Sequence, residues 1–171
     1  PMALSFSGAL DQAALQDAFA SVIERHDALR TIIRRAGGGL WQEVREAPPN
    51  PLEIVDLQGL HPGSRAGAAQ QLLATRARQP FDLACGVPIR AVLLRLSMEE
   101  HLLLIVMHHI ACDAWSASNF WRELSGFYGS RVAGTPPAVA SLPIRFADYV
   151  MWERDWLAPS RVAGQVAYWM H

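Results

Sequence analysis

The residues best suited to chemistry in this sequence are two adjacent histidines followed four positions later by an aspartate, within 107–116. Histidine is the side chain most able to move a proton near neutral pH, because its unperturbed pKa is about 6.5. The apolar run 102–107 before the histidines predicts a buried strand, and 116–131 predicts a helix. The histidines therefore lie where a strand ends and a helix begins, a place where a side chain can face a cleft.

Neighbouring residues of a strand point to opposite faces of the sheet, so we expect His108 and His109 to have different surroundings. If the strand persists through His109, then His108 shares a face with Val106, and His109 shares the other face with Met107. One ring should lie in the packed side and one in any cleft. Two histidines on opposite faces cannot bind one metal ion together, so we predict no metal site.

Asp113 suits two roles that the pattern alone leaves open. It can cap the helix that follows, because an aspartate at that position accepts a hydrogen bond from a backbone N–H of the first turn. It can instead pair with an arginine and so fix the turn that carries His109. Cys112 could be a nucleophile, but nothing in the sequence places its thiol against His109.

Composition excludes several classes of function. All 15 basic residues are arginine, as is typical of GC-rich bacterial coding, so lysine Schiff bases and lysine-dependent phosphate loops are ruled out. The net charge is −1 with no basic stripe, so no nucleic-acid partner is predicted. Cys85 and Cys112 lack zinc-type spacing and fit a reducing, cytoplasmic location. We expect neither a signal peptide nor a membrane span, since no apolar run reaches about 18 residues.

Periodicity predicts the elements that must position these residues. Strands are expected over 3–7, 52–55, 89–96 and 102–107, with a hairpin of 29–35 and 40–44 around three glycines. Helices are expected over 11–26, 66–78, 116–131, 146–157 and 161–168. The strands 89–96 and 102–107 are apolar on both faces, which predicts central places in a covered sheet. The predicted class is α/β or α+β, with a central mixed β-sheet flanked by helices.

The string HHIACDAWS, over 108–116, resembles the HHxxxDG motif of condensation domains of non-ribosomal peptide synthetases and of the wider chloramphenicol acetyltransferase-like superfamily. Four more stretches resemble condensation-domain segments in the same order, namely RHDALRT at 25–31, PFDLACGVPIRA at 80–91, LPIRFADYVMW at 142–152 and QVAYW at 165–169. Two features depart from the family: Ala114 replaces a glycine, and the first motif and the C-terminal lobe have no counterpart. The resemblance implies that 1–171 is the N-terminal lobe of a chloramphenicol acetyltransferase-like fold.

The resemblance also implies an acyltransferase that forms amide bonds in antibiotic biosynthesis. The α-amine of an acceptor would attack the thioester of a donor, both carried on phosphopantetheine arms of carrier protein domains, so no covalently bound cofactor is expected. A lobe of this kind would need the C-terminal lobe as a further partner and would be inactive alone. Charge on the thioester oxygen could be met by backbone N–H groups where the helix 116–131 begins.

The same resemblance implies the roles of the site residues. His109 is the catalytic residue, either as a general base or as a hydrogen-bond acceptor that positions the amine. Supporting residues are expected from the motif and from the segment 25–31, namely His108, Asp113, Ala114, Trp115, Ser116, Arg25 and Arg30. Asp113 is expected to pair with Arg25 first, with Arg30 second, or with an arginine of the C-terminal lobe.

Other functions stay open at this stage. An ester-forming acyltransferase of the same superfamily would use a hydroxyl acceptor, although the segments 25–31 and 80–91 favour the peptide-synthetase branch. Trp115 and Ser116 favour condensation over epimerisation, and a heterocyclising relative would carry aspartate in place of the histidines. A silent lobe that only docks carrier or tailoring proteins fits less well because His109 is present, yet Ala114 keeps that alternative open.

Overall fold

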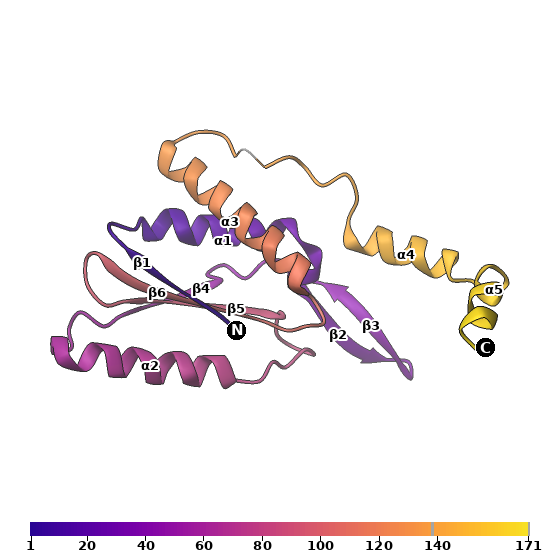
Figure 1. The fold of residues 1–171 in the computed structure, drawn as a ribbon, viewed down its shortest axis with the longest axis horizontal. Helices are drawn as coiled ribbons and strands as arrows, with labels where there is room; N and C mark the ends of the chain where they lie inside the picture. The colour runs from indigo at the N-terminus through magenta and orange to yellow at the C-terminus, as the bar shows by residue number, and fades with distance from the viewer. Residues whose placement is uncertain (138, 171) are drawn as a thin grey trace. The chain divides into compact units, whose positions relative to one another are not determined.

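The computed structural model describes residues 1–137 and 139–170, and it consists of two units, Pro1–Ala140 and Ser141–His171. The first unit is built on a four-stranded sheet in the order β1 (Met2–Ser7), β6 (Glu100–Met107), β5 (Ile89–Arg95) and β4 (Leu52–Asp56). Its helices are α1 (Gln12–Arg25), α2 (Pro62–Arg78) and α3 (Ala114–Ala133). Figure 1 shows α1 and α3 on one side of this sheet and α2 on the other. The β4–β5 pair is parallel and the other pairs are antiparallel, which confirms the predicted mixed sheet flanked by helices.

The two central strands are apolar on both faces, as predicted, because both faces are covered. Leu93 and Leu103 pack into the core beneath α1 and α3, whereas Val92 and Leu94 pack into a smaller core beneath α2. All four side chains are essentially inaccessible to water. Each such side chain stabilises the fold by about 1.5–3 kcal/mol relative to an exposed one, so this sheet is a firm base for the turn that follows β6.

Helix α1 joins the core through the apolar stripe that the sequence predicted. The Asp11 carboxylate accepts a hydrogen bond from the Ala14 N–H at 2.9 Å and begins the helix. The Phe19 ring meets Phe120 of α3 edge-on, with ring centroids 5.9 Å apart. Helices α1 and α3 therefore pack against each other, although they are far apart in the sequence.

The predicted hairpin is present as a separate two-stranded sheet of β2 (Thr31–Ala36) and β3 (Gly39–Val44). Gly37 and Gly38 form its two-residue turn with φ of 57° and 78°, a conformation that favours glycine. The prediction that the first strand begins at residue 29 was wrong. Residues Asp27–Arg30 form a 3-10 turn, η1, because buried Leu29 and the Thr31 hydroxyl, which donates to the Asp27 carbonyl at 2.7 Å, close it.

Three further helix starts differ from prediction. Helix α3 begins at Ala114 rather than residue 116, since Asp113 is its N-cap. Helix α2 begins at Pro62 rather than residue 66, since proline suits the first helical position and the His61 ring accepts from the Gly63 N–H at 3.3 Å. In the second unit, α4 (Phe146–Trp156) agrees with prediction and α5 (Pro159–Trp169) begins two residues early. No residue of α4 is buried, and four of its aromatic rings follow one another at centroid distances of 5.8–6.4 Å, namely Phe146, Tyr149, Trp152 and Trp156.

Candidate functional site

The two histidines lie in a turn and not in the strand. β6 ends at Met107, so the assumption that it persists through His109 was wrong. The His108 N–H donates to the Pro88 carbonyl at 2.9 Å, and the Ala111 N–H then donates to the His108 carbonyl at 3.0 Å, which reverses the chain. The His108 ring is half-buried, whereas His109 is exposed. The expected difference between the two rings is therefore present, but the turn produces it and strand alternation does not.

The hydrogen bond of His109 fixes which ring nitrogen can react. Its Nδ1 lies 3.1 Å from the Cys112 carbonyl oxygen, and a carbonyl oxygen can only accept. In the neutral ring the proton is therefore on Nδ1, and Nε2 keeps its lone pair. Within the described residues Nε2 has no hydrogen-bond partner. The arrangement gives an exposed imidazole with a free acceptor, oriented by its own loop.

Asp113 caps α3, which is one of the two roles that the sequence allowed. Its carboxylate accepts from the Ser116 N–H at 2.7 Å and from the Ser116 hydroxyl at 2.6 Å, and these bonds lower the pKa of Asp113. The expected ion pair of Asp113 with Arg25 or Arg30 was wrong, because Arg25 binds Glu123 and Arg30 binds Asp27. The third option, an arginine of a C-terminal lobe, stays a prediction.

The carboxylate of Asp113 also changes the expectation for the thioester oxygen. It occupies the Ser116 N–H and brings negative charge to the first turn of α3. A developing oxyanion at the same place would be repelled by that charge. The start of α3 is therefore a poor site for the oxyanion, contrary to what the sequence led us to expect.

Glu123 is a buried charged residue whose role sequence reasoning missed. This buried carboxylate of α3 accepts from Arg25 Nε at 3.1 Å and lies 2.6 Å from His26 Nε2. A buried carboxylate needs such partners, since an unpaired one costs several kcal/mol. Its position was a usable signal, because Glu123 falls on the apolar stripe between Phe120 and Phe127. The segment 25–31 thus ties the end of α1 to α3.

Arg30 performs a similar task for the hairpin. Its guanidinium binds the Asp27 carboxylate and donates to the Arg45 carbonyl at 2.6 Å. The Arg45 N–H returns a bond of 2.9 Å to the Arg30 carbonyl. Arg25 and Arg30 are thus structural residues of the unit Pro1–Ala140, and neither contacts the His109 turn through a hydrogen bond among the described residues.

The remaining motif residues surround the turn. Ala114 is the first residue of α3, and no non-glycine residue of the described chain has a positive φ, so alanine there carries no backbone strain. Trp115 is 81% exposed, next to Ser116 that binds Asp113. Burial, with a smaller effect of Asp113, raises the pKa of the Cys112 thiol. That thiol therefore stays protonated near neutral pH, which argues against a nucleophilic role.

The helix cap gives a pH-dependent prediction. Because the pKa of Asp113 is lowered in the folded state, its stabilisation is present above the unfolded pKa of about 3.9 and is lost as pH falls through the lower folded value. Asp113→Asn should retain the cap at every pH, since asparagine caps helices equally well. The difference between the thermal unfolding midpoints of the two proteins should thus be constant above about pH 4 and should shift in favour of Asp113→Asn as pH falls below that value. Parallel curves for the two proteins would contradict the cap.

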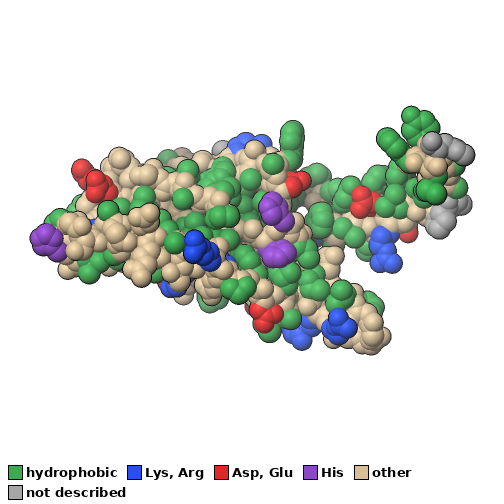
Figure 2. All heavy atoms as spheres, turned by 60° about the horizontal axis from the view of Figure 1, so that its bottom comes forward, with side chains coloured by type: hydrophobic (Ala, Val, Ile, Leu, Met, Phe, Trp, Pro, Cys, Tyr) green, Lys and Arg blue, Asp and Glu red, His purple; other side chains and the backbone are tan. Residues whose placement is uncertain are grey.

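Figure 2 shows exposed histidine side chains that lie among mainly hydrophobic and neutral atoms. Among residues 1–137 and 139–170, no three histidine, cysteine, aspartate or glutamate side chains come together to bind a metal ion. In the same residues no helix combines the length and the apolar character that crossing a bilayer requires.

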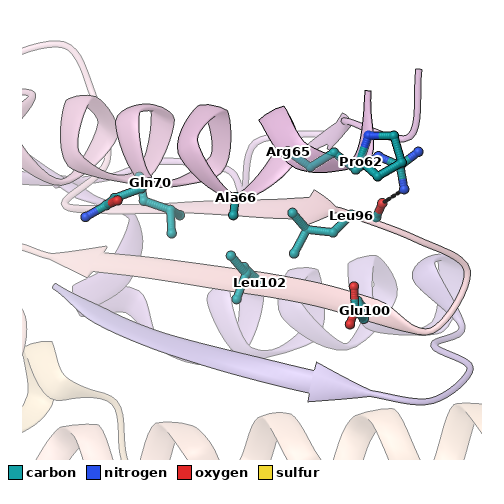
Figure 3. Close-up of a pocket in the computed structure, with 8 residues that line it drawn as sticks. Pro62, Arg65, Ala66, Gln70, Leu96, Glu100 and Leu102 are labelled. Atoms are coloured by element: carbon teal, nitrogen blue, oxygen red, sulfur yellow. Dashed lines mark hydrogen bonds between the residues drawn. The ribbon is translucent and has the colours of Figure 1, made fainter. Parts of the chain in front are cut away.

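A cavity of about 360 Å³ lies elsewhere, between α2 and the hairpin of β5 and β6 (Figure 3). Arg65 projects from α2 toward it but is already engaged, because it donates to the carbonyls of Leu60, Leu96 and Gln58 at 2.8–3.0 Å. Glu100, which also lines the cavity, begins β6, whereas His109 follows its other end, roughly 23 Å along the strand. This cavity is separate from the histidine turn and lacks a free cationic group.

Comparison with known proteins places these observations among relatives. The model of the family "Condensation domain" matches residues 1–171. The chain is 37% identical over 169 residues to chondramide synthase cmdD of Chondromyces crocatus, covering 99% of this chain and 4% of that protein. It is 40% identical over 175 residues to isonitrile lipopeptide synthase of Mycobacterium tuberculosis, covering 98% of this chain and 7% of that protein. The chain therefore spans a small part of the length of these relatives.

Solved structures agree with the sequence comparison. The X-domain from teicoplanin biosynthesis is 35% identical, with a TM-score of 0.82 over 98% of this chain and 36% of that one. The starter condensation domain of rhizomide synthetase is 21% identical, with a TM-score of 0.86 over 98% of this chain and 40% of that one. The latter likeness is one of fold alone, and it confirms the predicted chloramphenicol acetyltransferase-like fold.

Proposed function

This chain belongs to the condensation-domain family, and we propose that it is the N-terminal lobe of a condensation domain that forms amide bonds between carrier-bound substrates. The acceptor α-amine attacks the carbonyl carbon of the donor thioester, so a C–N bond forms and the C–S bond breaks. The amine loses a proton, and the phosphopantetheine sulfur leaves as a thiol. Donor and acceptor carrier protein domains and a C-terminal lobe are the partners that this function requires.

The observation that carries the proposal is the orientation of the His109 ring. Its Nδ1–H donates to the Cys112 carbonyl, which leaves the Nε2 lone pair exposed. An α-amine has a pKa of about 7.7–8.0 and is partly neutral near pH 7, so it needs little help to become a nucleophile. Nε2 accepts a hydrogen bond from the neutral amine, which orients it, and the same atom is placed to take the proton as the C–N bond forms.

A docking function is the second candidate, and one comparison favours it. The X-domain of teicoplanin biosynthesis has been solved as a complex with OxyB, and this chain is 34% identical to that X-domain with a TM-score of 0.82. A lobe of the same fold in this protein would bind another protein of the pathway and leave the acyl chain unchanged. The free Nε2 of His109 would have no task in that case.

The choice of acceptor tests the proposal. The complete condensation domain should be mixed with a loaded donor carrier and with either an aminoacyl or a hydroxyacyl carrier. We expect the amide product from the amine acceptor and only background ester from the hydroxyl acceptor, as read by mass spectrometry of the carriers. Ester in excess of amide would identify the ester-forming alternative. No product from either acceptor, together with stable binding of a pathway protein, would support docking instead.

A further inference from the structure

The half-buried ring of His108 is held by a stack of side chains from outside the histidine motif. Phe81, in the loop after α2, meets the His108 ring edge-on at a centroid distance of 5.9 Å. Phe81 also contacts Arg90, whose guanidinium carbon lies 4.2 Å from the centre of the Phe81 ring. Such a cation–π contact is attractive because the ring face carries negative charge density. Arg90, Phe81 and His108 thus form a continuous stack.

Both ends of this stack are anchored to the backbone. The Arg90 guanidinium donates to the carbonyls of Gln79 and Pro80, so it fixes the start of the loop that carries Phe81. At the other end, the His108 Nδ1 accepts from the Ile110 N–H at 3.1 Å, which shapes the turn in which His109 lies. The orientation of the reactive ring is thereby linked to a residue of β5.

Arginine is a costly choice at position 90 if stability were its task. Its Nε is buried and has no hydrogen-bond partner within the described residues, and burial lowers the pKa of the guanidinium. A well-packed apolar side chain of similar size avoids that desolvation cost. An apolar side chain could not donate to two carbonyls while contacting an aromatic ring, as the Arg90 guanidinium does.

We infer that Arg90 is a positioning residue for the condensation reaction, acting through Phe81 and His108 to set the direction of the His109 ring. The inference rests on the proposed function for its effect on catalysis, but its structural part does not. Arg90 touches no substrate in this scheme. Arg90 holds the loop that carries Phe81, and Phe81 contacts the His108 ring. The His108 ring in turn accepts the hydrogen bond that shapes the turn containing His109.

The structural part is tested by NMR on the 171-residue chain, using the ring ¹⁵N shifts of His108 and His109, assigned with His108→Gln and His109→Gln. In the parent protein we expect the proton on Nε2 of His108 and on Nδ1 of His109. Arg90→Met should move both rings toward a mixture of tautomers. Arg95→Met is the matched control, because Arg95 lies on the same strand and also has a buried, unpartnered Nε, but pairs with Asp56 at its far end.

The catalytic part is tested in the complete condensation domain. Arg90→Met should lower kcat about tenfold with little change in KM for the acceptor carrier, because a misplaced catalytic group costs rate more than binding. Arg95→Met should leave kcat near the parent value. Arg90→Lys should rescue kcat only in part, since lysine keeps the charge over Phe81 but loses the two-carbonyl geometry.

Phe81→Leu covers the case in which Arg90→Met fails to fold, because it removes the ring and leaves Arg90 in place. Parent ¹⁵N shifts in both variants would overturn the inference whatever the activity. A His109→Ala domain that retains full activity would overturn the proposed function and leave the NMR result standing. If His109→Ala abolishes activity while both stack variants keep the parent kcat, the inference alone fails.

Discussion

Replacing His109 by alanine in the complete condensation domain is expected to slow peptide formation about a hundredfold, the low end of what a proton-transfer group contributes. The low end applies because the attacking amine is partly neutral already. The fold should survive, since the His109 ring is exposed and its loss empties no packed site. The measurement is the initial rate of dipeptidyl product by mass spectrometry, with a thermal unfolding curve for each protein.

His108→Ala is the matched control for this substitution. Its ring is half-buried against Phe81 and accepts the Ile110 N–H, so its loss should lower the unfolding midpoint as well as the rate. A lower rate with an unchanged unfolding midpoint is thus expected for His109→Ala, and a lower rate with a lower midpoint for His108→Ala. A His109→Ala domain that condenses at the parent rate, with thioester hydrolysis accounted for, would exclude both the base and the positioner roles.

A second large effect is expected from the 171-residue chain by itself, which should fold cooperatively and form no dipeptide. The unit Pro1–Ala140 has its own core on both faces of the sheet, so cooperative unfolding is expected. The proposed reaction requires two tethered substrates to meet at His109, and such alignment supplies roughly 7–11 kcal/mol of the barrier. The chain spans 36% of the X-domain chain that it matches. By our proposal, the C-terminal lobe that completes the site belongs to the remainder.

The test mixes the purified chain with loaded donor and acceptor carriers and compares its product with that of the complete domain. Sedimentation velocity on the same sample should show self-association, because α4 exposes its four aromatic side chains along one helix. Adding the remainder of the domain should restore turnover and reduce self-association. Turnover by the chain alone, comparable to that of the complete domain, would show that the site does not require a second lobe.

Elements with strong periodicity were predictable from sequence because their burial follows from local pattern. The stripe that includes Phe19 predicted α1, and the two-sided apolar strands β5 and β6 fell in the centre of the sheet as expected. The N-cap role of Asp113 was one of the two roles that the sequence left open, and it was within reach of sequence reasoning because capping depends on residues within one turn. Features that depend on residues close together in the chain, such as helix caps and apolar faces, are therefore predictable from sequence.

Contacts between distant segments were harder to predict. The pairing of Asp113 with Arg25 failed because the arginine had a nearer buried carboxylate, Glu123, on the packed side of α3. The sequence of one helix does not show which polar residue on its buried face has a charged partner, because the partner belongs to the neighbouring helix. The contacts among Arg90, Phe81 and His108 join a strand, a loop and a turn. A hydrophobic repeat describes one helix or strand at a time, so it could not predict contacts among the three segments.

The pairing of β1 with β6 has a consequence for how this chain is synthesised. Met2 lies opposite Ile105, so β1 cannot find its partner strand until about 100 more residues have been made. At about 5–20 residues per second, that delay lasts roughly 5–20 s. The apolar face of α1 is covered even later, because it packs against α3, which follows β6 in the chain. During that interval the nascent chain exposes the apolar residues of its future core. Chaperones that recognise apolar segments would bind the chain at this stage.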